Sequence, residues 1–268
     1  MGRFDGRVVL ITGAARGQGR SHAVTLARQG ADVAICDVGA ALGDLEETAR
    51  LVRAEGRRAH SGRVDVTDSA QVDAFVASTL EELGRIDGMC ANAAVYSLGM
   101  IVDVSDEQFR RTLDVNLTGV FFCIRAVLPH MMERRSGRIV VIASVGGRAG
   151  FANTAHYTSS KWGVIGLTKC AAVEAAPYGI TVNAVCPTTV NTPMINTEEN
   201  YRHFRPDLEH PTLEDVLPAL EAINPMPGPW VEPEDVSDAV AFLLSDEARY
   251  ISGETLGVAM GWTAHNAA

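Results

Sequence analysis

Short apolar runs alternate with helical stretches along almost the whole chain, and this alternation limits the possible folds more than any other feature. Strand-length runs occupy Val8–Thr12, Asp32–Asp37, Arg58–Val64, Ile86–Asn92, Arg138–Ser144, Ile180–Cys186 and, more briefly, Thr255–Ala259. They are continuous rather than alternating, which is typical of strands buried on both faces of a parallel sheet. Helical patterns separate them at Gln18–Gln29, Asp44–Glu55, Ser69–Leu83, Asp106–Arg135 and Tyr157–Tyr178. The sequence therefore predicts a doubly wound α/β sheet of about seven strands in three α/β/α layers.

One segment interrupts this alternation. Between residues 191 and 232 prolines are frequent and aromatic residues cluster. A long interruption inside a compact α/β domain is usually functional, so we expect a lid; a surface insertion without a role is the alternative. No linker or repeat divides the chain, and we expect one domain spanning residues 1–268.

Composition and charge exclude several classes of partner. The 268 residues carry a formal net charge of −10 and no Lys/Arg-rich run, which argues against nucleic acid or an anionic membrane. No apolar run approaches the roughly 20 residues needed to span a bilayer, and no secretory signal is recognisable. The five cysteines lie singly in apolar surroundings without a C-x-x-C pair, so we expect buried thiols in a reducing cytoplasm and no metal site.

The first strand leads into a glycine-rich loop, "TGAARGQG". Gly13, Gly17 and Gly19 match neither the G-x-G-x-x-G nor the Walker spacing. Nevertheless, a strand, three glycines and a helix are the setting of a dinucleotide loop, because the backbone can approach a pyrophosphate at a helix N-terminus. A turn whose glycines serve only packing is the alternative.

An acidic residue about twenty positions further on indicates which dinucleotide is bound. Asp37 ends the second strand, where its carboxylate would accept hydrogen bonds from the adenosine ribose and repel a 2′-phosphate. Arg16 could instead attract that phosphate. We expect the carboxylate to dominate, with Arg16 paired to Asp37 or solvated, so NAD is favoured over NADP.

A second constellation carries the chemistry. Tyr157 and Lys161 stand four residues apart on a predicted helix, which places both side chains on one face. Ser144 lies thirteen residues before Tyr157, at the end of a strand, and ligands of open α/β sheets bind outside the carboxyl ends of strands.

With these residues in place, the chain resembles the short-chain dehydrogenase/reductase family, whose fold is Rossmann-type. The matching features are Thr12 with the three glycines, Asn116 in "DVNLTGVF", Ser144, Tyr157 with Lys161, and "VNAVCPTTVNTP". The resemblance implies that Tyr157 removes the hydroxyl proton of an alcohol, with its pKa lowered by Lys161 and the nicotinamide charge. It further implies that Lys161 holds the nicotinamide ribose, Ser144 orients the substrate and Asn116 seats a proton-relay water.

The resemblance also assigns cofactor contacts by position. Beyond the loop residues, which include Gln18, these are Asp37, Val38, Asp65, Val66, Asn92, Ala93, Tyr157, Lys161, Pro187, Val190 and Thr192. Two residues depart from the family pattern. Ala94 replaces the glycine of N-N-A-G, and Thr188 replaces the glycine that usually follows Pro187.

A narrower resemblance comes from "GAARGQGRSHA" and "VNTPMINTEENYRHFRPDLEHPTLEDV". Together they resemble the carveol-dehydrogenase-like, mycofactocin-associated subgroup. Its members hold NAD very tightly and pass electrons to a peptide-derived redox carrier. The resemblance implies a secondary-alcohol dehydrogenase for an apolar, terpenoid-like substrate. The alternatives are an NADP-dependent ketone or 3-oxoacyl reductase and a non-catalytic dinucleotide sensor.

Two further expectations concern surfaces. We expect an apolar pocket lined by Met194, Ile195, Tyr201, Phe204 and Trp230, although these side chains could merely attach the 191–232 segment to the body. His156, beside Tyr157, is expected to be structural; the alternative is that it faces the substrate. Helices Asp106–Arg135 and Tyr157–Tyr178 are apolar over much of their circumference, so we expect a second subunit to cover them, in a homotetramer as the family resemblance implies.

Overall fold

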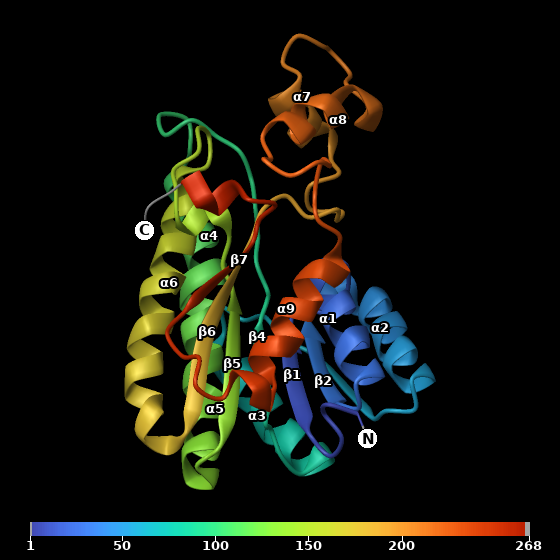
Figure 1. Ribbon diagram of the computed structural model, residues 1–268, viewed down its shortest axis with the longest axis vertical. Coiled ribbons are helices and arrows are strands. Elements are labelled where there is room, and N and C mark those ends of the chain that lie inside the picture. Colours follow the sequence, from blue (N-terminus) through green and yellow to red (C-terminus); the bar gives the residue numbers. More distant parts are fainter. Residues whose placement is uncertain (1, 266–268) are drawn as a thin grey trace.

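Seven parallel strands form one sheet in the computed structural model, which describes residues 2–265 (Figure 1). The strands are β1 (Val8–Thr12), β2 (Asp32–Asp37), β3 (Ala59–Arg63), β4 (Gly88–Ala91), β5 (Gly137–Ile142), β6 (Ile180–Pro187) and β7 (Thr255–Val258). Their order is β3-β2-β1-β4-β5-β6-β7, and every neighbouring pair is parallel. The prediction of a seven-stranded Rossmann-type sheet is confirmed.

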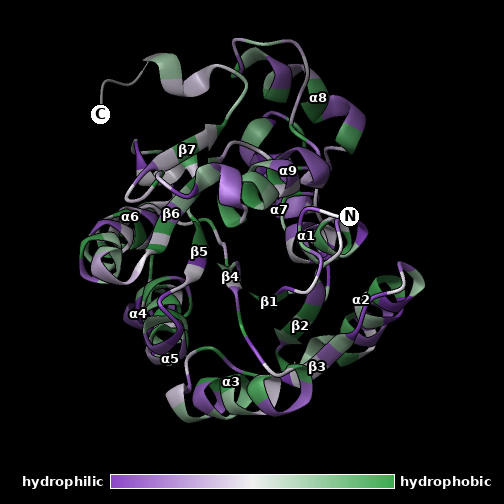
Figure 2. Cartoon of the chain, turned by 60° about the horizontal axis from the view of Figure 1, so that its bottom comes forward, coloured by the Kyte–Doolittle hydropathy of each residue, from purple (hydrophilic) through white to green (hydrophobic). Residues whose placement is uncertain are grey.

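Helices cover both faces of the sheet. One face carries α1 (Gly17–Arg28), α2 (Leu42–Ala54) and α9 (Pro233–Leu244); the other carries α3 (Ser69–Leu83), α5 (Gly119–Arg134) and α6 (Ala155–Ala175) (Figure 1). Alternate residues of a strand serve the two faces: in β1, Val8 and Leu10 join the α3/α5/α6 core, whereas Val9 and Ile11 join the α1/α2/α9 core. Each of these helices contributes apolar residues to the core on its side of the sheet, and hydrophobic and hydrophilic residues alternate along the helices (Figure 2).

The helix expected over residues 106–135 is interrupted. It consists of α4 (Asp106–Leu113), a π-helical turn (Asp114–Thr118) and α5. π-turns inside α-helices are frequent at functional sites, and this turn contains Asn116. The combined stretch Asp106–Arg134 is long and apolar enough to cross a membrane by length and composition, although no single apolar run suggested it. Its inner side chains, from Val120 to Met131, belong to the buried core.

Three helices lie outside the predicted elements. α7 (Glu198–Phe204) and α8 (Leu213–Ala222) lie within the 191–232 segment, and α9 follows it directly. The start of α9 carries a signal that the proline-rich composition obscured. Pro233 occupies the first helical turn, and the Glu232 backbone N–H donates to the Asp235 carboxylate at 2.8 Å.

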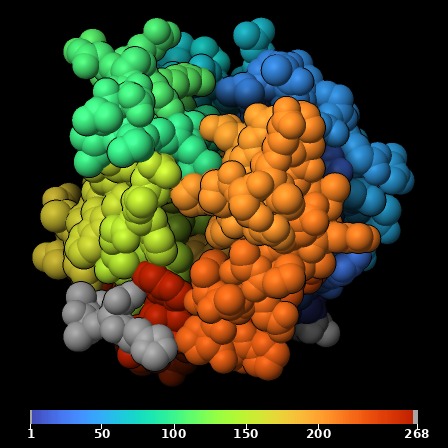
Figure 3. All heavy atoms as spheres, turned by 90° about the horizontal axis from the view of Figure 1, so that it is seen from above, coloured from blue at the N-terminus to red at the C-terminus, as the bar shows by residue number. Residues whose placement is uncertain are grey.

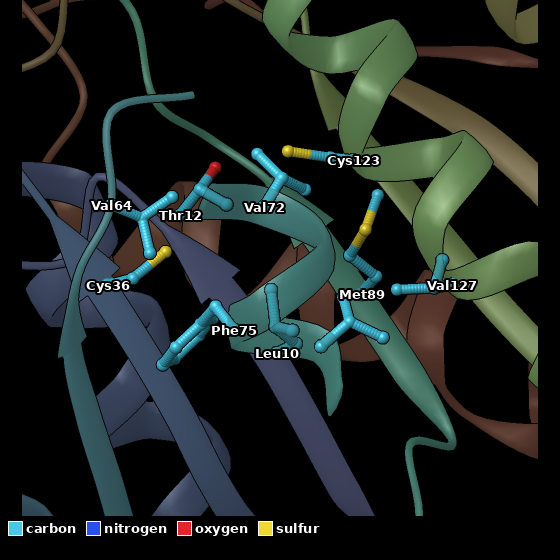
Figure 4. Close-up of a pocket in the computed structure, with 10 residues that line it drawn as sticks. Leu10, Thr12, Cys36, Val64, Val72, Phe75, Met89, Cys123 and Val127 are labelled. Carbon is cyan, nitrogen blue, oxygen red and sulfur yellow. The ribbon is translucent and has the colours of Figure 1, made fainter. Parts of the chain in front are cut away.

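A narrow void lies within the closely packed interior. About 10 Å³ of space lies beneath α3 and α5 (Figure 4), lined almost entirely by apolar side chains, among them Leu10, Phe75, Met89 and Val127. This volume barely admits one water, and an apolar void of that size stays dry. The void is therefore part of the core rather than a binding site.

Candidate active site

The glycine loop follows β1 at the carboxyl edge of the sheet. At this point the chain leaves the neighbouring strands β1 and β4 in opposite directions, because β1 leads to β2 on one side and β4 leads to β5 on the other. Gly13 and Gly17 have positive φ angles of 66° and 55°, which side chains rarely adopt. Arg16 occupies the N-cap position of α1 without a side-chain capping bond, and the first turn of the helix contains no acidic residue. The N–H groups of this turn are consequently available to an anion.

Close packing explains the third glycine. A Cβ on Gly19 would lie 2.1 Å from the Gly13 carbonyl oxygen and 2.7 Å from Asn92 Nδ2. The Asn92 amide in turn donates to the carbonyls of Thr12 (2.9 Å) and Gly13 (3.0 Å), and the Ala93 N–H donates to Thr12 Oγ1. Asn92 and Ala93 thus support the loop from β4.

Asp37 ends β2 beside this loop. Its carboxylate accepts hydrogen bonds from the Ala15 N–H (3.0 Å) and the Val38 N–H (2.8 Å). Arg16 is exposed and does not pair with Asp37. Of the two expectations for Arg16, solvation is therefore confirmed and pairing is wrong. The glycines, the uncapped helix and the carboxylate fit the pyrophosphate and ribose of NAD.

Tyr157 and Ser144 face one another at the carboxyl ends of β5 and β6. Ser144 lies two residues beyond β5, not within it, and its hydroxyl accepts from the Gly146 N–H at 3.0 Å. Burial raises the pKa of Tyr157, and a hydrogen bond with Ser144 opposes that rise. The lowered pKa expected from Lys161 is therefore not produced by the side chains around Tyr157, where burial dominates.

Lys161 follows Tyr157 by one turn of α6. Its ammonium Nζ lies 5.6 Å from the centroid of the Tyr157 ring and donates to the Ile142 carbonyl at 2.8 Å. Burial lowers the pKa of Lys161 to about 8. The predicted i, i+4 arrangement thus places both side chains at one site, although the amine is held by the end of β5 rather than by the phenol.

Asn116 is fully buried in the π-turn. Its side-chain oxygen accepts from the Val95 N–H (2.8 Å), and its amide donates to the Val95 carbonyl (2.9 Å) and to Ser160 Oγ (3.1 Å). The side chain therefore holds the loop after β4 against α6.

Ser144 and Tyr157 border a cavity of about 380 Å³ between the sheet edge and the 191–232 segment, whereas Lys161 and Asn116 are not part of its lining. Seen from above, the orange 191–232 segment covers one side of the upper surface, and the yellow-green start of α6 lies on the other side (Figure 3). Ser144, Tyr157, Gln18, Pro187, Val190 and Thr192 line the cavity, and so do the expected Met194, Ile195 and Phe204. The buried Oε1 of Gln18 has no hydrogen-bond partner in the described chain, as expected of a group that awaits a ligand.

Two residues expected in the cavity wall lie outside it. Tyr201 and Trp230 do not line the cavity, and the Trp230 indole donates to Glu232 at 2.9 Å. Val38 is exposed, and Val66 is buried against Gly119. The Asp65 carboxylate accepts from the N–H and the hydroxyl of Thr67. Within residues 2–265 no group of three or more His, Cys, Asp or Glu is placed to hold a metal ion.

The cavity also contains aromatic residues that motif spacing did not identify. Tyr96 packs edge-on against Tyr157, with ring centroids 5.0 Å apart. The ring centroids of Phe151 and Trp262 are 5.3 Å apart. They come from the β4–α4 loop, the β5–α6 loop and the chain after β7. No periodic pattern marks them, because only the fold brings these loops together.

The chain is similar to known proteins over nearly its full length. A family model described as enoyl-(acyl carrier protein) reductase matches residues 13–263. The chain is 45% identical to (−)-trans-carveol dehydrogenase of Rhodococcus erythropolis, over 98% of this chain and 99% of that protein. It is 37% identical to levodione reductase of Leifsonia aquatica, over 98% and 96% of the two chains.

Solved structures agree with these relatives. Carveol dehydrogenase of Mycobacterium avium in complex with NAD has a TM-score of 0.96 and 43% identity, covering 98% of this chain and 100% of that one. A short-chain dehydrogenase of Mycobacterium paratuberculosis bound to NAD has a TM-score of 0.88 and 35% identity, covering 98% and 100%. Asp37 at the end of β2 agrees with this cofactor. The chain therefore belongs to the short-chain dehydrogenase/reductase family and is an NAD-dependent oxidoreductase that acts on CH–OH groups.

Proposed function

We propose that the protein oxidises a secondary alcohol on an apolar, carveol-like terpenoid substrate to the ketone, with Tyr157 as the base. The observation that carries the proposal is the position of Tyr157 and Ser144 in the wall of a cavity whose remaining lining is mainly apolar. An apolar pocket with a few convergent polar groups suits such a substrate. The relatives named for carveol and levodione support the class of substrate.

Each polar residue has a role in this proposal. Bound NAD supplies the hydride acceptor and a positive charge near Tyr157. Tyr157 takes the hydroxyl proton, Ser144 orients the substrate oxygen, and the Lys161 ammonium holds the nicotinamide ribose. Because burial alone raises the pKa of Tyr157, the phenolate needs a nearby positive charge to form at neutral pH. Asn116 acts by holding the Val95 backbone, beside which a relay water would be seated.

The cofactor contacts assigned by position belong to the same proposal. Gly13, Arg16, Gly17, Gln18 and Gly19 would hold the pyrophosphate. Asp37, Val38, Asp65, Val66, Asn92 and Ala93 would surround the adenosine, and Pro187, Val190 and Thr192 would surround the nicotinamide. The 191–232 segment would act as a lid on a single domain.

Substitution of the base tests the assignment. Tyr157→Phe should lower kcat for alcohol oxidation about 1000-fold, because a positioned general base contributes roughly that much. NAD binding, measured by calorimetry, should stay near the wild-type value. Tyr178→Phe, in the turn after α6, is the matched control and should retain activity. Turnover retained by Tyr157→Phe would refute the proposed base.

The proposal extends to assembly, cell compartment and electron transfer. Phe121 on α5 and Trp162 and Val173 on α6 are exposed apolar side chains, which supports a homotetramer built through these helices. All five cysteines are free, as suits the cytoplasm, although Cys170 is exposed and not buried as expected.

A mycofactocin-type carrier would accept electrons if NAD does not exchange. Stoichiometric NAD released on denaturing the purified protein supports that carrier, and a freely exchanging site contradicts it.

A further inference from the structure

Three consecutive residues of the loop between β4 and α4 each contact a different group around the candidate base. Val95 exchanges two hydrogen bonds with the Asn116 side chain, at 2.8 and 2.9 Å. Tyr96 packs its ring at 89° to the Tyr157 ring, with centroids 5.0 Å apart. Ser97 Oγ shares a 2.9 Å hydrogen bond with His156 Nε2. Adjacent loop residues therefore contact adjacent helix residues, Tyr157 and His156.

His156 is a buried polar side chain without a role in the proposed chemistry. Its imidazole is fully buried in the first turn of α6, and its Nδ1 has no hydrogen-bond partner in the described chain. Gln108 of α4 extends the contact, because its amide donates to Ser97 Oγ at 3.0 Å and to the Leu98 carbonyl at 3.4 Å. Burial of an unpaired ring nitrogen is costly, and loss of the Ser97 bond would leave both nitrogens of His156 unpaired, so this bond orients the ring.

We propose that the hydrogen-bonded chain Gln108–Ser97–His156 is a positioning device that holds Tyr96 against Tyr157 and thereby sets the orientation and hydration of the base. Tyr96 and His156 are then positioning residues. The inference rests on the proposed role of Tyr157. Tyr96 lines the substrate cavity directly, whereas the Ser97–His156 bond acts on Tyr157 through the loop.

The packing explains how this device would affect the chemistry. An edge-on aromatic neighbour fixes the ring plane and excludes water from one side of the phenol. Burial raises the pKa of Tyr96 to about 12, with Tyr157 and Glu199 of α7 adding to the rise, so Tyr96 remains an uncharged neighbour. The other titratable groups that face Tyr157 are Lys161 on α6 and Cys186 on β6. Among residues 2–265, no hydrogen bond or ion pair joins either of them to Gln108, Ser97 or His156.

The pH profile of kcat/KM for alcohol oxidation by the NAD-loaded enzyme tests the proposal. Tyr96→Ala should admit water beside Tyr157, which relieves the burial that raises its pKa. The rise of activity with pH should then move about half a pH unit or more towards lower pH. Tyr96→Phe retains the ring and should keep the wild-type profile.

Variants of Ser97 and His156, which do not line the cavity, distinguish positioning of the base from direct contact with the substrate. Ser97→Ala and His156→Leu should lower kcat about 10-fold and shift the profile in the same direction, while KM and NAD affinity stay within about 2-fold. His156→Gln can still bond Ser97 and should recover most of the loss. His22→Asn, a fully buried imidazole between α1 and α9, is the matched control and should leave the profile unchanged.

Each outcome decides the question. Unmoved profiles in Tyr96→Ala and Ser97→Ala, with or without loss of activity, would overturn the proposal. If His156→Leu does not fold, Ser97→Ala, which removes the same bond from the loop side, gives the answer. If Tyr157→Phe retains full activity in the same assay, the proposed base is wrong, and that result is separate from a failure of the positioning device alone.

Discussion

The nucleotide loop and the substrate cavity are built in opposite ways. The loop is local: Gly13, Gly17 and Gly19 lie within seven residues, and Asp37 reaches the Ala15 N–H from the next strand. The cavity takes its walls from the loops after β4, β5 and β6, from the 191–232 segment and from the chain after β7. The loop depends on backbone conformation, whereas the cavity depends on side-chain volume. Substitutions in the two regions should therefore fail differently.

Among substitutions that test packing in these two regions, the largest effect is expected in the loop. Gly19→Ala would place a Cβ 2.1 Å from the Gly13 carbonyl oxygen, and the backbone must shift to accommodate it. Overpacking of this kind costs up to about 3 kcal/mol, which corresponds to roughly 100-fold weaker NAD binding if the loop bears the strain. Calorimetric titration with NAD measures this.

Gly43→Ala is the matched control for the glycine substitution. Gly43 lies on an exposed turn of α2, and its added Cβ would meet no atom within 4 Å. This variant should bind NAD normally and gain up to about 1 kcal/mol of stability from better helix propensity. Equal NAD affinities of the two variants would show that the close packing at Gly19 is unimportant.

The second effect concerns acid stability beneath the loop. His22 on α1 is fully buried, its Nδ1 bonds to Ser237 Oγ of α9 at 2.8 Å, and burial lowers its pKa from 6.5 to about 3. Below pH 6.5 His22 is protonated in the unfolded chain, whereas in the folded chain it stays neutral down to about pH 3. The free energy of unfolding therefore decreases as the pH falls through this window.

The expected loss of unfolding free energy due to His22 is about 2 kcal/mol between pH 6.5 and pH 5, at roughly 1.4 kcal/mol per pH unit. Urea unfolding of wild type and His22→Asn at pH 7 and pH 5 measures it. The wild type should lose more stability than the variant on acidification. Parallel losses would mean that His22 does not control the acid sensitivity of the α1–α9 contact.

Among the same packing substitutions, the smallest effect is expected for the apolar wall of the cavity. Phe204→Ala removes an apolar wall from α7 and should raise KM for an apolar alcohol about 10-fold, with NAD affinity unchanged. Tyr201→Ala, on the same helix but outside the lining, is the control and should leave KM nearly unchanged. An equal rise in both variants would indicate that the 191–232 segment acts as a whole and not through its lining.

The sequence predicted the sheet well because its signals are local. Every strand was predicted within two residues at each end, and continuous apolar runs marked the central strands. The expectation of apolar strands buried on both faces was wrong for β3, whose sequence AHSGR is mostly polar and only partly buried at the edge of the sheet. Tyr157 and Lys161 lie on one helix face as their spacing requires. α7, α8 and α9 were not predicted, since prolines and charged residues masked their periodicity. The helix at 106–135 was predicted as continuous, because the π-turn at Asn116 depends on bonds to Val95 and Ser160.

By itself, the sequence determined the parallel sheet, the glycine loop with its acidic partner, and the spacing of Ser144, Tyr157 and Lys161. These features are fixed by short-range geometry: the period of a strand, the turn of a helix and the φ angle of a glycine. Only the tertiary structure decided that Tyr96 faces Tyr157, that His156 bonds Ser97, and that Tyr201 stays outside the cavity. Those contacts join residues up to about 60 positions apart, and burial rather than pattern selects them.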